Sequence, residues 1–466
     1  MIKVFTNFSY PTEVEDVVKL FFSDVVACDN QQDADVVCLY EKKSDDITNT
    51  CYYNGKKVSN SFKANNMDDL QFWRVAKRFA KTAVYNCLKK STGRSMPWGS
   101  LTGIRPVKLA VQLTEEGKDY KSEFADFFDV KQDKIALVEE ILSQQESIRS
   151  AGNYTDLYIG IPFCVSRCSY CSFTGGEIAR LSKYVEPYVD TLCREITTTL
   201  QFAKDHGVQI KNVYFGGGTP TSLDARDLKR ILQCVNIAGI EEFTVEAGRP
   251  DTIDKDKLDV MLDCGVNRIS VNPQSFNNCT LEKVGRRHTV EDMYDKYNLA
   301  RSYPFVINAD LIAGLPDESV EMFARSVDSL LTLHPDNITV HTLALKKGAE
   351  LKLQNYHGQQ QIVADMVQYS HDVLHKNGYK AYYMYRQKYM SDNLENVGFC
   401  LDGKQCVYNV DNMEELRSII ACGSNAISKR IFYGQNRIER SANAKDVITY
   451  INNIDQYLER KLKLFM

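Results

Sequence analysis

Three cysteines, Cys164, Cys168 and Cys171, stand close together in the segment YIGIPFCVSRCSYCSF. Because so few residues separate them, a single loop can bring all three thiols to a common centre. Thiolates are the ligands of iron-sulfur clusters, and a cuboidal four-iron cluster takes one thiolate on each iron. Three cysteines leave one iron open. The spacing therefore predicts a 4Fe-4S cluster that can bind a further ligand, with these cysteines as the catalytic and metal-binding residues.

An open iron can chelate the amino and carboxylate groups of S-adenosylmethionine (SAM). Chelation brings the sulfonium against the cluster for one-electron reduction, which releases a 5′-deoxyadenosyl radical. The cofactors carry this chemistry, while the protein fixes the geometry and excludes water. The alternatives are a structural zinc site and three unrelated core thiols. Structural zinc usually takes four protein ligands, and no fourth Cys or His lies nearby in the sequence, so we favour the cluster.

Glycines and polar residues lie where the next predicted strands end. The glycine run alone is better explained by a turn, and each polar residue alone is explained equally well by a solvated strand end. Because the carboxyl ends of parallel strands meet at one rim, we expect them together to form a pocket for SAM. The residues are Gly216, Gly217, Gly218 and Thr219 after the second strand, Glu246 at the end of the third, Gln274 after the fourth and Asp310 in the fifth.

Two neighbouring arginines, Arg286 and Arg287 in VGRRHT, have the chemistry to bind the carboxylate of SAM. A guanidinium presents a planar fork that matches a carboxylate. Both residues carry the same group, so the choice between them stays open on chemistry alone.

Apolar runs alternate with longer stretches from Tyr154 onward, and each stretch has room for a helix. Such a repeat predicts parallel strands with right-handed crossovers. We therefore expect an α/β fold, a partial barrel of six β-α units with its ligands beyond the carboxyl ends of the strands. The six runs are DLYIGIPF, VYFGG, EFTVEA, RISVNP, VINADLIAG and NITVHTLAL.

Three regions are expected along the chain. Residues 1–150 predict an α+β domain of unknown role, with a hairpin turn at Asn54-Gly55 and a helix from Met67 to Lys90 that ends near Gly93. Residues 151–390 form the barrel. Residues 391–466 form a small C-terminal region that covers the substrate.

Composition excludes several classes of protein. The 57 basic and 61 acidic side chains give a net charge of −4, so no overall field attracts nucleic acid or an anionic membrane. No apolar run has the length of a membrane span, and the first residues, MIKVFTNFSYPTEVEDVV, lack the basic region and long apolar run of a signal peptide. We expect a cytoplasmic protein. Its remaining cysteines mostly stand singly in apolar segments, which is typical of reduced core thiols.

The sequence resembles the oxygen-independent coproporphyrinogen III oxidase group of radical SAM proteins over about residues 150 to 350. Outside that range it resembles the HemZ type of coproporphyrinogen dehydrogenase. The resemblance rests on YIGIPFCVSRCSYCSF, YFGGGTPTSL, TVEAGRPDTI, RISVNPQSF, GRRHT and DLIAGLP, and on PWGSLTGIRPVKL and YYMYRQKYMSDNLENVGF outside the central part.

The resemblance implies roles for individual residues. It places the three cysteines on the cluster and favours Arg286 over Arg287 for SAM. Tyr158, Gly217 to Thr219, Glu246, Gln274 and Asp310 would contact the cluster or SAM. We also expect three aromatic residues in and beside the cysteine loop to bind the cofactors, namely Phe163, Tyr170 and Phe173.

The implied reaction is oxidative decarboxylation of two propionates of coproporphyrinogen III to vinyl groups. A low-potential electron donor such as flavodoxin or ferredoxin would be a partner. A tetrapyrrole-like substrate needs aromatic walls and cationic groups for its carboxylates. The weakly indicated candidates, which an ordinary edge strand explains equally well, are Tyr382, Tyr383, Tyr385, Arg386 and Lys388.

Two departures from the group keep other functions open. The cysteine motif ends in Cys171-Ser172-Phe173, without the extra cysteine of the best-characterised branch. Ser424 and Asn425 in IIACGSNAISKR add side chains where glycine and alanine are expected. The alternatives are radical alkylation or ring modification of haem or another substrate, and a haem-binding delivery protein of the same superfamily.

Overall fold

The computed structural model describes residues 1–103, 105–173, 175–344, 349–353, 360–387, 394–435 and 437–466. The chain divides into two compact units. The first holds residues 1–139 with Arg386, Gln387 and Leu394, and the second holds residues 140–385 and 395–466. The sequence predicts a boundary near residue 150. The division instead falls inside helix α5 (Gln132–Gln144), where helical periodicity continues and leaves no break in the pattern.

The first unit is built on a sheet with the strand order β2-β1-β3-β4-β5. β1 pairs in parallel with β2 and β3, and the last three strands form an antiparallel meander. Helix α2 packs on β4 and β5. The elements are β1 (Ile2–Thr6), α1 (Pro11–Val18), β2 (Val25–Ala27), η1 (Gln31–Asp33), β3 (Val36–Lys43), β4 (Asp46–Tyr53), β5 (Lys56–Lys63), α2 (Asp69–Thr92), α3 (Pro106–Glu115), α4 (Tyr120–Ser122) and η2 (Glu123–Phe127).

Both local predictions in this unit are confirmed. Asn54 and Gly55 have φ values of 46° and 71°, the left-handed pair that a type I′ hairpin turn requires. The predicted helix is α2. The side chain of Asp68 accepts a hydrogen bond from the Gln71 amide at its start, and Gly93 ends it with a φ of 71°.

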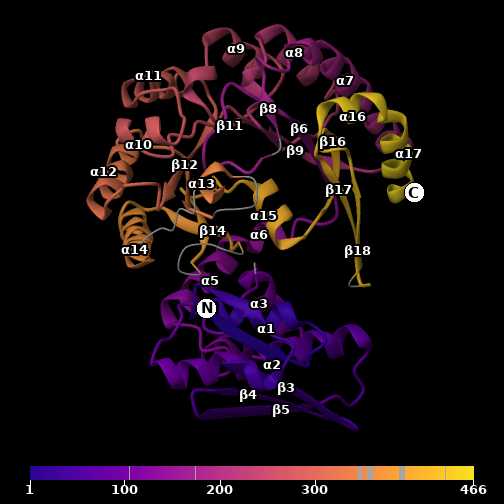
Figure 1. Ribbon diagram of the computed structural model, residues 1–466. Helices are drawn as coiled ribbons and strands as arrows, with labels where there is room; N and C mark the ends of the chain where they lie inside the picture. Colours follow the sequence, from indigo (N-terminus) through magenta and orange to yellow (C-terminus); the bar gives the residue numbers. More distant parts are fainter. Residues whose placement is uncertain (104, 174, 345–348, 354–359, 388–393, 436) are drawn as a thin grey trace. The chain divides into compact units, whose positions relative to one another are not determined.

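The second unit contains the predicted β-α repeat. Six strands lie side by side in the order in which they occur in the sequence, and each pairs in parallel with the next. In Figure 1 the helices α7, α8, α9, α11, α12 and α14 follow one another around the outside of this curved sheet. The strands are β6 (Thr155–Ile161), β9 (Ile210–Gly217), β10 (Glu242–Glu246), β11 (Arg268–Ser270), β12 (Val306–Ala313) and β13 (Asn337–Thr342).

Strands from the C-terminal part of the chain extend this sheet at both of its edges. β15 (Asn396–Cys400) pairs antiparallel with β13 and with β14 (Lys380–Tyr385). β16 (Ser418–Gly423) pairs in parallel with β6 on the other side and continues into β17 and β18. β15 and β16 are buried along their whole lengths, as interior strands must be. Residues 391–466, predicted as a separate region, thus belong largely to the same sheet.

The remaining elements of the second unit cover the sheet or carry its loops. Among the described residues, none of the helices is both long enough and apolar enough to cross a lipid bilayer. The bounds are α6 (Glu146–Arg149), β7 (Phe163–Cys164), β8 (Gly176–Glu177), α7 (Ser182–Asp205), η3 (Pro220–Ser222), α8 (Ala225–Gln233), η4 (Pro250–Thr252), α9 (Lys255–Asp263), α10 (Asn278–Lys283), α11 (Val290–Arg301), α12 (Val320–Leu331), α13 (Glu350–Leu353), α14 (Gln360–Lys376), α15 (Val407–Glu414), β17 (Ile427–Phe432), β18 (Arg437–Ala442), α16 (Val447–Asn452) and α17 (Ile454–Phe465).

Candidate functional site

The three cysteines of the predicted cluster motif line a single cavity of about 290 Å³. They lie on the loop that leaves β6, and each is a free thiol. A loop that presents three free thiols to one cavity fits a cuboidal cluster. The other residues around the cavity are Ser166, Arg167, Phe173, Gly175, Gly176, Glu177, Arg180, Leu181, Gly217 and Gly218.

Among the described residues that line the cavity, the three cysteines are the only Cys or His side chains, whereas structural zinc usually takes four protein ligands. No group of three or more His, Cys, Asp or Glu side chains in the described part of the chain is arranged to hold a metal ion by itself. A cluster differs from a single ion because its thiolates bind separate irons, so its ligands need not converge on one point.

The glycine run at the end of β9 lies against the start of the cysteine loop. Gly217 has a φ of 110°, and a Cβ atom there would lie 2.7 Å from the carbonyl oxygen of Ile161. A Cβ on Gly218 would lie 2.4 Å from the carbonyl oxygen of Phe163. Glycine is therefore required for the two chain segments to approach each other. The same two residues leave backbone exposed on the cavity.

Thr219 connects this run to the first cysteine. Its hydroxyl lies 3.2 Å from the Sγ of Cys164, and its amide donates to the carbonyl oxygen of Phe163 over 2.7 Å. The aromatic ring of Phe163 points elsewhere. It is fully buried in the core, with its centroid 5.2 Å from that of Tyr188. Of the expected aromatic contacts, Phe173 lines the cavity and Phe163 contributes its backbone.

Two carboxylates on strands of the barrel, Glu246 at the end of β10 and Asp310 inside β12, carry opposite pKa shifts. Burial raises the pKa of Glu246 to about 7, and the negative charge of Asp310 adds to the rise. A hydrogen bond of 2.6 Å from the Tyr214 hydroxyl lowers the pKa but does not outweigh burial. Burial also works on Asp310, but interactions with His341 and Asn308 outweigh it and lower the pKa of that carboxyl. Near neutral pH, Glu246 can hold a proton while Asp310 stays ionised.

Gln274 is held in an unusual conformation beside these groups. Its φ is 67°, and its backbone pairs with β12 through the amide-to-Asp310 hydrogen bond of 2.9 Å. The side-chain Oε1 is buried and has no hydrogen-bond partner among the described residues. A buried acceptor without a partner is rare in folded proteins. It fits a site whose partner is a ligand.

Arg286 is buried, and most of its donors are used inside the protein. Nη2 donates to the carbonyl oxygens of Gly248 and Asn272, and Nη1 donates to the Tyr170 hydroxyl over 3.2 Å. Only Nε is without a partner among the described residues. The guanidinium thus ties the cysteine loop to the loops after β10 and β11. Arg287 is exposed.

Three stacked tyrosines form an aromatic cluster that the sequence reasoning only partly found. The rings of Tyr214 and Tyr408 are 4.4 Å apart at 20°, and Tyr158 stacks 6.3 Å from Tyr408. Tyr158 was expected at the site. Tyr214 lies inside the quoted VYFGG run, so alternation along that strand could have identified it. Tyr408 comes from α15, where no sequence signal links it to the barrel.

The three expected substrate tyrosines lie together on β14, with ring centroids 4.8 Å apart for Tyr382 and Tyr383 and 6.4 Å apart for Tyr383 and Tyr385. Tyr382 and Tyr383 are buried, and the Tyr385 hydroxyl lies 3.2 Å from Nδ1 of His341. Arg386 donates to the carbonyl oxygens of Leu101 and Gly103, and its guanidinium stacks 5.2 Å from the Trp98 ring. Lys388 lies outside the described residues.

Arg249 is a further residue that the sequence reasoning missed. It lies in the quoted TVEAGRP segment, three residues beyond Glu246, and its guanidinium is within 3.6 Å of the Sγ of Cys168. A search for charged residues just beyond each strand end would have found it.

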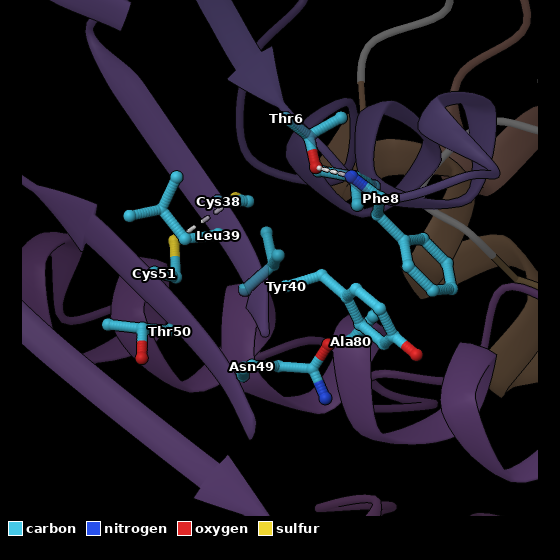
Figure 2. Close-up of a pocket in the computed structure, with 12 residues that line it drawn as sticks. Thr6, Phe8, Cys38, Leu39, Tyr40, Asn49, Thr50, Cys51 and Ala80 are labelled. Carbon is cyan, nitrogen blue, oxygen red and sulfur yellow. Dashed lines mark hydrogen bonds between the residues drawn. The ribbon is translucent and has the colours of Figure 1, made fainter. Parts of the chain in front are cut away.

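A cavity in the first unit is too small to bind a cofactor or substrate. Figure 2 shows it among side chains that include Phe8, Cys38 and Cys51. Its volume of about 10 Å³ is no more than one water molecule needs. Cys38 and Cys51 lie 3.5 Å apart there as buried thiols.

Comparison with known proteins places this geometry in a family. Residues 158–330 match the radical SAM superfamily. The chain is 34% identical to the oxygen-independent coproporphyrinogen-III oxidase-like protein HemZ of Bacillus subtilis (strain 168), over 97% of this chain and 94% of that protein. It is 33% identical to the heme chaperone HemW of Lactococcus lactis subsp. lactis (strain IL1403), over 48% of this chain and 60% of that protein.

A solved structure shares the fold. Coproporphyrinogen III oxidase (HemN) from Escherichia coli, a radical SAM enzyme, superposes with a TM-score of 0.52 at 23% identity, over 67% of this chain and 72% of that chain. The similarity to HemZ, which covers nearly the whole of both chains, identifies the group within the superfamily. The chain belongs to the radical SAM superfamily and, within it, to the oxygen-independent coproporphyrinogen III oxidase group of which HemZ is a member.

Proposed function

We propose that this chain cleaves SAM reductively and uses the resulting radical to decarboxylate two propionates of coproporphyrinogen III to vinyl groups. The observation that carries the proposal is the cavity lined by Cys164, Cys168 and Cys171 at the carboxyl end of the barrel strands. The substrate rests on the relation to HemZ over nearly the whole chain. Family membership implies a 4Fe-4S cluster and SAM as cofactors.

The cysteines would hold the cluster, which when bound supplies the single electron that splits SAM into methionine and a 5′-deoxyadenosyl radical. Thr219 fixes the position of the Cys164 thiol through its 3.2 Å contact. Gly217 and Gly218 border the cavity with bare backbone, which lets a ligand approach closely.

Polar groups around the rim have the charges that SAM requires. Its sulfonium and ammonium groups are cationic. Asp310 keeps its negative charge because interactions with His341 and Asn308 lower its pKa, whereas Glu246, with a pKa raised to about 7, is only partly charged near neutral pH. The unpartnered Oε1 of Gln274 can accept a hydrogen bond from a SAM hydroxyl or amino group. The free Nε of Arg286 is the donor left for the SAM carboxylate.

The tyrosine cluster suits a flat macrocyclic substrate. Tyr158, Tyr214 and Tyr408 are nearly parallel to one another, and a tetrapyrrole packs well on such rings. Of the expected substrate residues, Tyr385 is the half-buried member, and we keep it as a contact. Each propionate would lose one hydrogen atom to the radical. Carbon dioxide and one electron then leave, and an external acceptor takes the electron.

A product assay tests this proposal. The full chain is reconstituted anaerobically with iron and sulfide and incubated with SAM, dithionite and coproporphyrinogen III, with haem or buffer in parallel. Mass spectrometry should detect 5′-deoxyadenosine and a product lacking two carbon dioxide molecules and four hydrogen atoms. If a tetrapyrrole instead gains a methyl or adenosyl group, the reaction is radical alkylation and the decarboxylation proposal is wrong. If SAM is cleaved but neither coproporphyrinogen III nor haem changes, the proposed tetrapyrrole substrate is wrong.

A second candidate function is haem binding and delivery, which the similarity to the heme chaperone HemW favours. The motif ending Cys171-Ser172-Phe173, without a further cysteine, supports the same candidate. It predicts a stable haem complex that forms without turnover and survives in C168A. Absorbance titration of wild type and C168A with haem separates the two functions, because the decarboxylase requires Cys168 and the carrier does not.

A further inference from the structure

All three guanidinium nitrogens of Arg249 donate hydrogen bonds beside the cysteine loop. It is 3% exposed and follows β10. Nε and Nη2 donate to the two oxygens of Asp251, each over 2.9 Å. Nη1 donates to the hydroxyl of Ser166 over 2.9 Å and to its carbonyl oxygen over 3.5 Å. The same Nη1 lies 3.6 Å from the Sγ of Cys168.

We propose that Arg249 is a positioning residue that sets the reduction potential of the cluster through its contact with Cys168. The inference rests on the proposed cluster and adds a residue that tunes it. A protein adjusts the reduction potential of such a cluster through nearby charges and through hydrogen bonds to the sulfur atoms of its ligands. Arg249 supplies both to one ligand.

The sign of the effect follows from charge. Reduction brings one electron from a low-potential donor and takes the cluster from the 2+ to the 1+ state, which adds negative charge beside Cys168. Arginine remains protonated in proteins, and a buried cation interacts strongly with a new negative charge because the surroundings screen it weakly. Arg249 should therefore stabilise the reduced state and raise the potential.

Asp251 opposes this effect and also directs it. Its two oxygens fix the plane of the guanidinium and point Nη1 at the sulfur. Its negative charge partly offsets that of Arg249, but its side chain is 22% exposed whereas that of Arg249 is 3% exposed. Solvent screens the carboxylate more than the guanidinium, so the positive charge dominates at Cys168.

The test measures the midpoint potential of the cluster by a redox titration followed by electron paramagnetic resonance. Wild type, R249Q, R249K and R287Q are reconstituted in the full chain, and iron and sulfide are counted in each. R287Q is the matched control, because it removes the same charge from an exposed neighbour of Arg286. At the wild-type midpoint, R249Q should show at least a tenfold lower ratio of reduced to oxidised cluster, a shift of about 59 mV for one electron.

R249K should lie between R249Q and wild type because it keeps the charge and loses the fork, and R287Q should match wild type. Equal potentials for R249Q and wild type at equal iron content would overturn the inference. If R249Q holds no iron, R249K decides, since it keeps a positive charge and loses the planar fork. A lower potential in R249K than in wild type supports the inference, and an unchanged one overturns it. Wild type that forms no cluster would instead overturn the proposed function.

Discussion

The hydroxyl of Tyr214, from the middle of β9, donates a 2.6 Å hydrogen bond to Oε1 of Glu246 at the end of the neighbouring strand β10. The bond favours the charged carboxylate, yet burial outweighs it and raises the pKa of Glu246 to about 7. The folded protein therefore holds a proton on Glu246 at pH values where the unfolded chain has released it.

A pH-dependent stability difference follows for E246Q. Because the folded pKa lies above the unfolded one, wild type loses stability as pH rises from about 4.5 to about 7, by up to about 3 kcal/mol. Glutamine stays neutral throughout. E246Q should match wild type in melting temperature at pH 5 and exceed it by a few °C at pH 8. The exposed E459Q is the control. The same difference at both pH values would contradict the assignment.

Gly217 should tolerate alanine far less well than Gly207. Both have a positive φ, but a Cβ at Gly207 meets nothing within 4 Å, whereas one at Gly217 meets the backbone of Ile161. G207A should cost about 1–2 kcal/mol for its backbone conformation. G217A should cost about 1–3 kcal/mol more from overpacking and should lower iron retention after reconstitution. Melting temperatures and iron counts that are equal in the two variants would show that the close approach does not matter.

Lys461 and Glu195 form an ion pair of 2.7 Å, with side chains that are 1% and 0% exposed. The pair joins α17 to α7, and Glu195 also accepts hydrogen bonds from the Gly423 amide and the Tyr450 hydroxyl. K461M leaves a buried charge without its partner and should destabilise the second unit by about 3–5 kcal/mol.

R226M gives the matched measurement on an exposed pair. Arg226 and Glu186 lie 3.0 Å apart with side chains that are 68% and 55% exposed, so its loss should change stability by less than about 1 kcal/mol. Urea unfolding of both variants checks the contrast. A K461M variant as stable as R226M would mean that Glu195 finds other compensation.

Tyr408 tests the proposed substrate wall. Y408A removes the ring that stacks 4.4 Å from Tyr214, and Y408F keeps it. Binding of coproporphyrin III, followed by fluorescence, should weaken at least tenfold in Y408A, or about 1.4 kcal/mol, and stay within about twofold in Y408F. Equal affinities in the two variants would remove the tyrosine cluster from the binding site.

Local sequence features predicted the parts of the molecule that local physics determines. The six barrel strands are apolar runs bounded by glycine and proline, and the glycine at 217 is needed for a contact between neighbouring strands. The cysteine spacing predicts that one loop brings the three thiols to the same site, and all three line one cavity.

Long-range pairing could not be read in the same way. β16 pairs with β6 so that Ala421 stands opposite Tyr158. Neither segment has a sequence feature that indicates the other as its partner. The acceptors of Arg286 and Arg386 are backbone carbonyl oxygens from distant loops. A guanidinium in the sequence does not reveal whether it will meet a ligand or the main chain. Arg249 differs, because its position just beyond β10 is visible in the sequence, while its contact with Cys168 depends on how the two loops meet.

The cluster cysteines give the most direct test of the central claim. Wild type, C164S, C168S, C171S and C279S are reconstituted anaerobically and incubated with SAM and dithionite, and 5′-deoxyadenosine is quantified against bound iron. C279S is the control because Cys279 is an exposed thiol away from the cavity. Wild type and C279S should bind iron and release 5′-deoxyadenosine, and each triad variant should lose both. SAM cleavage that persists in the triad variants would contradict the claim that these three thiols hold the reactive cluster.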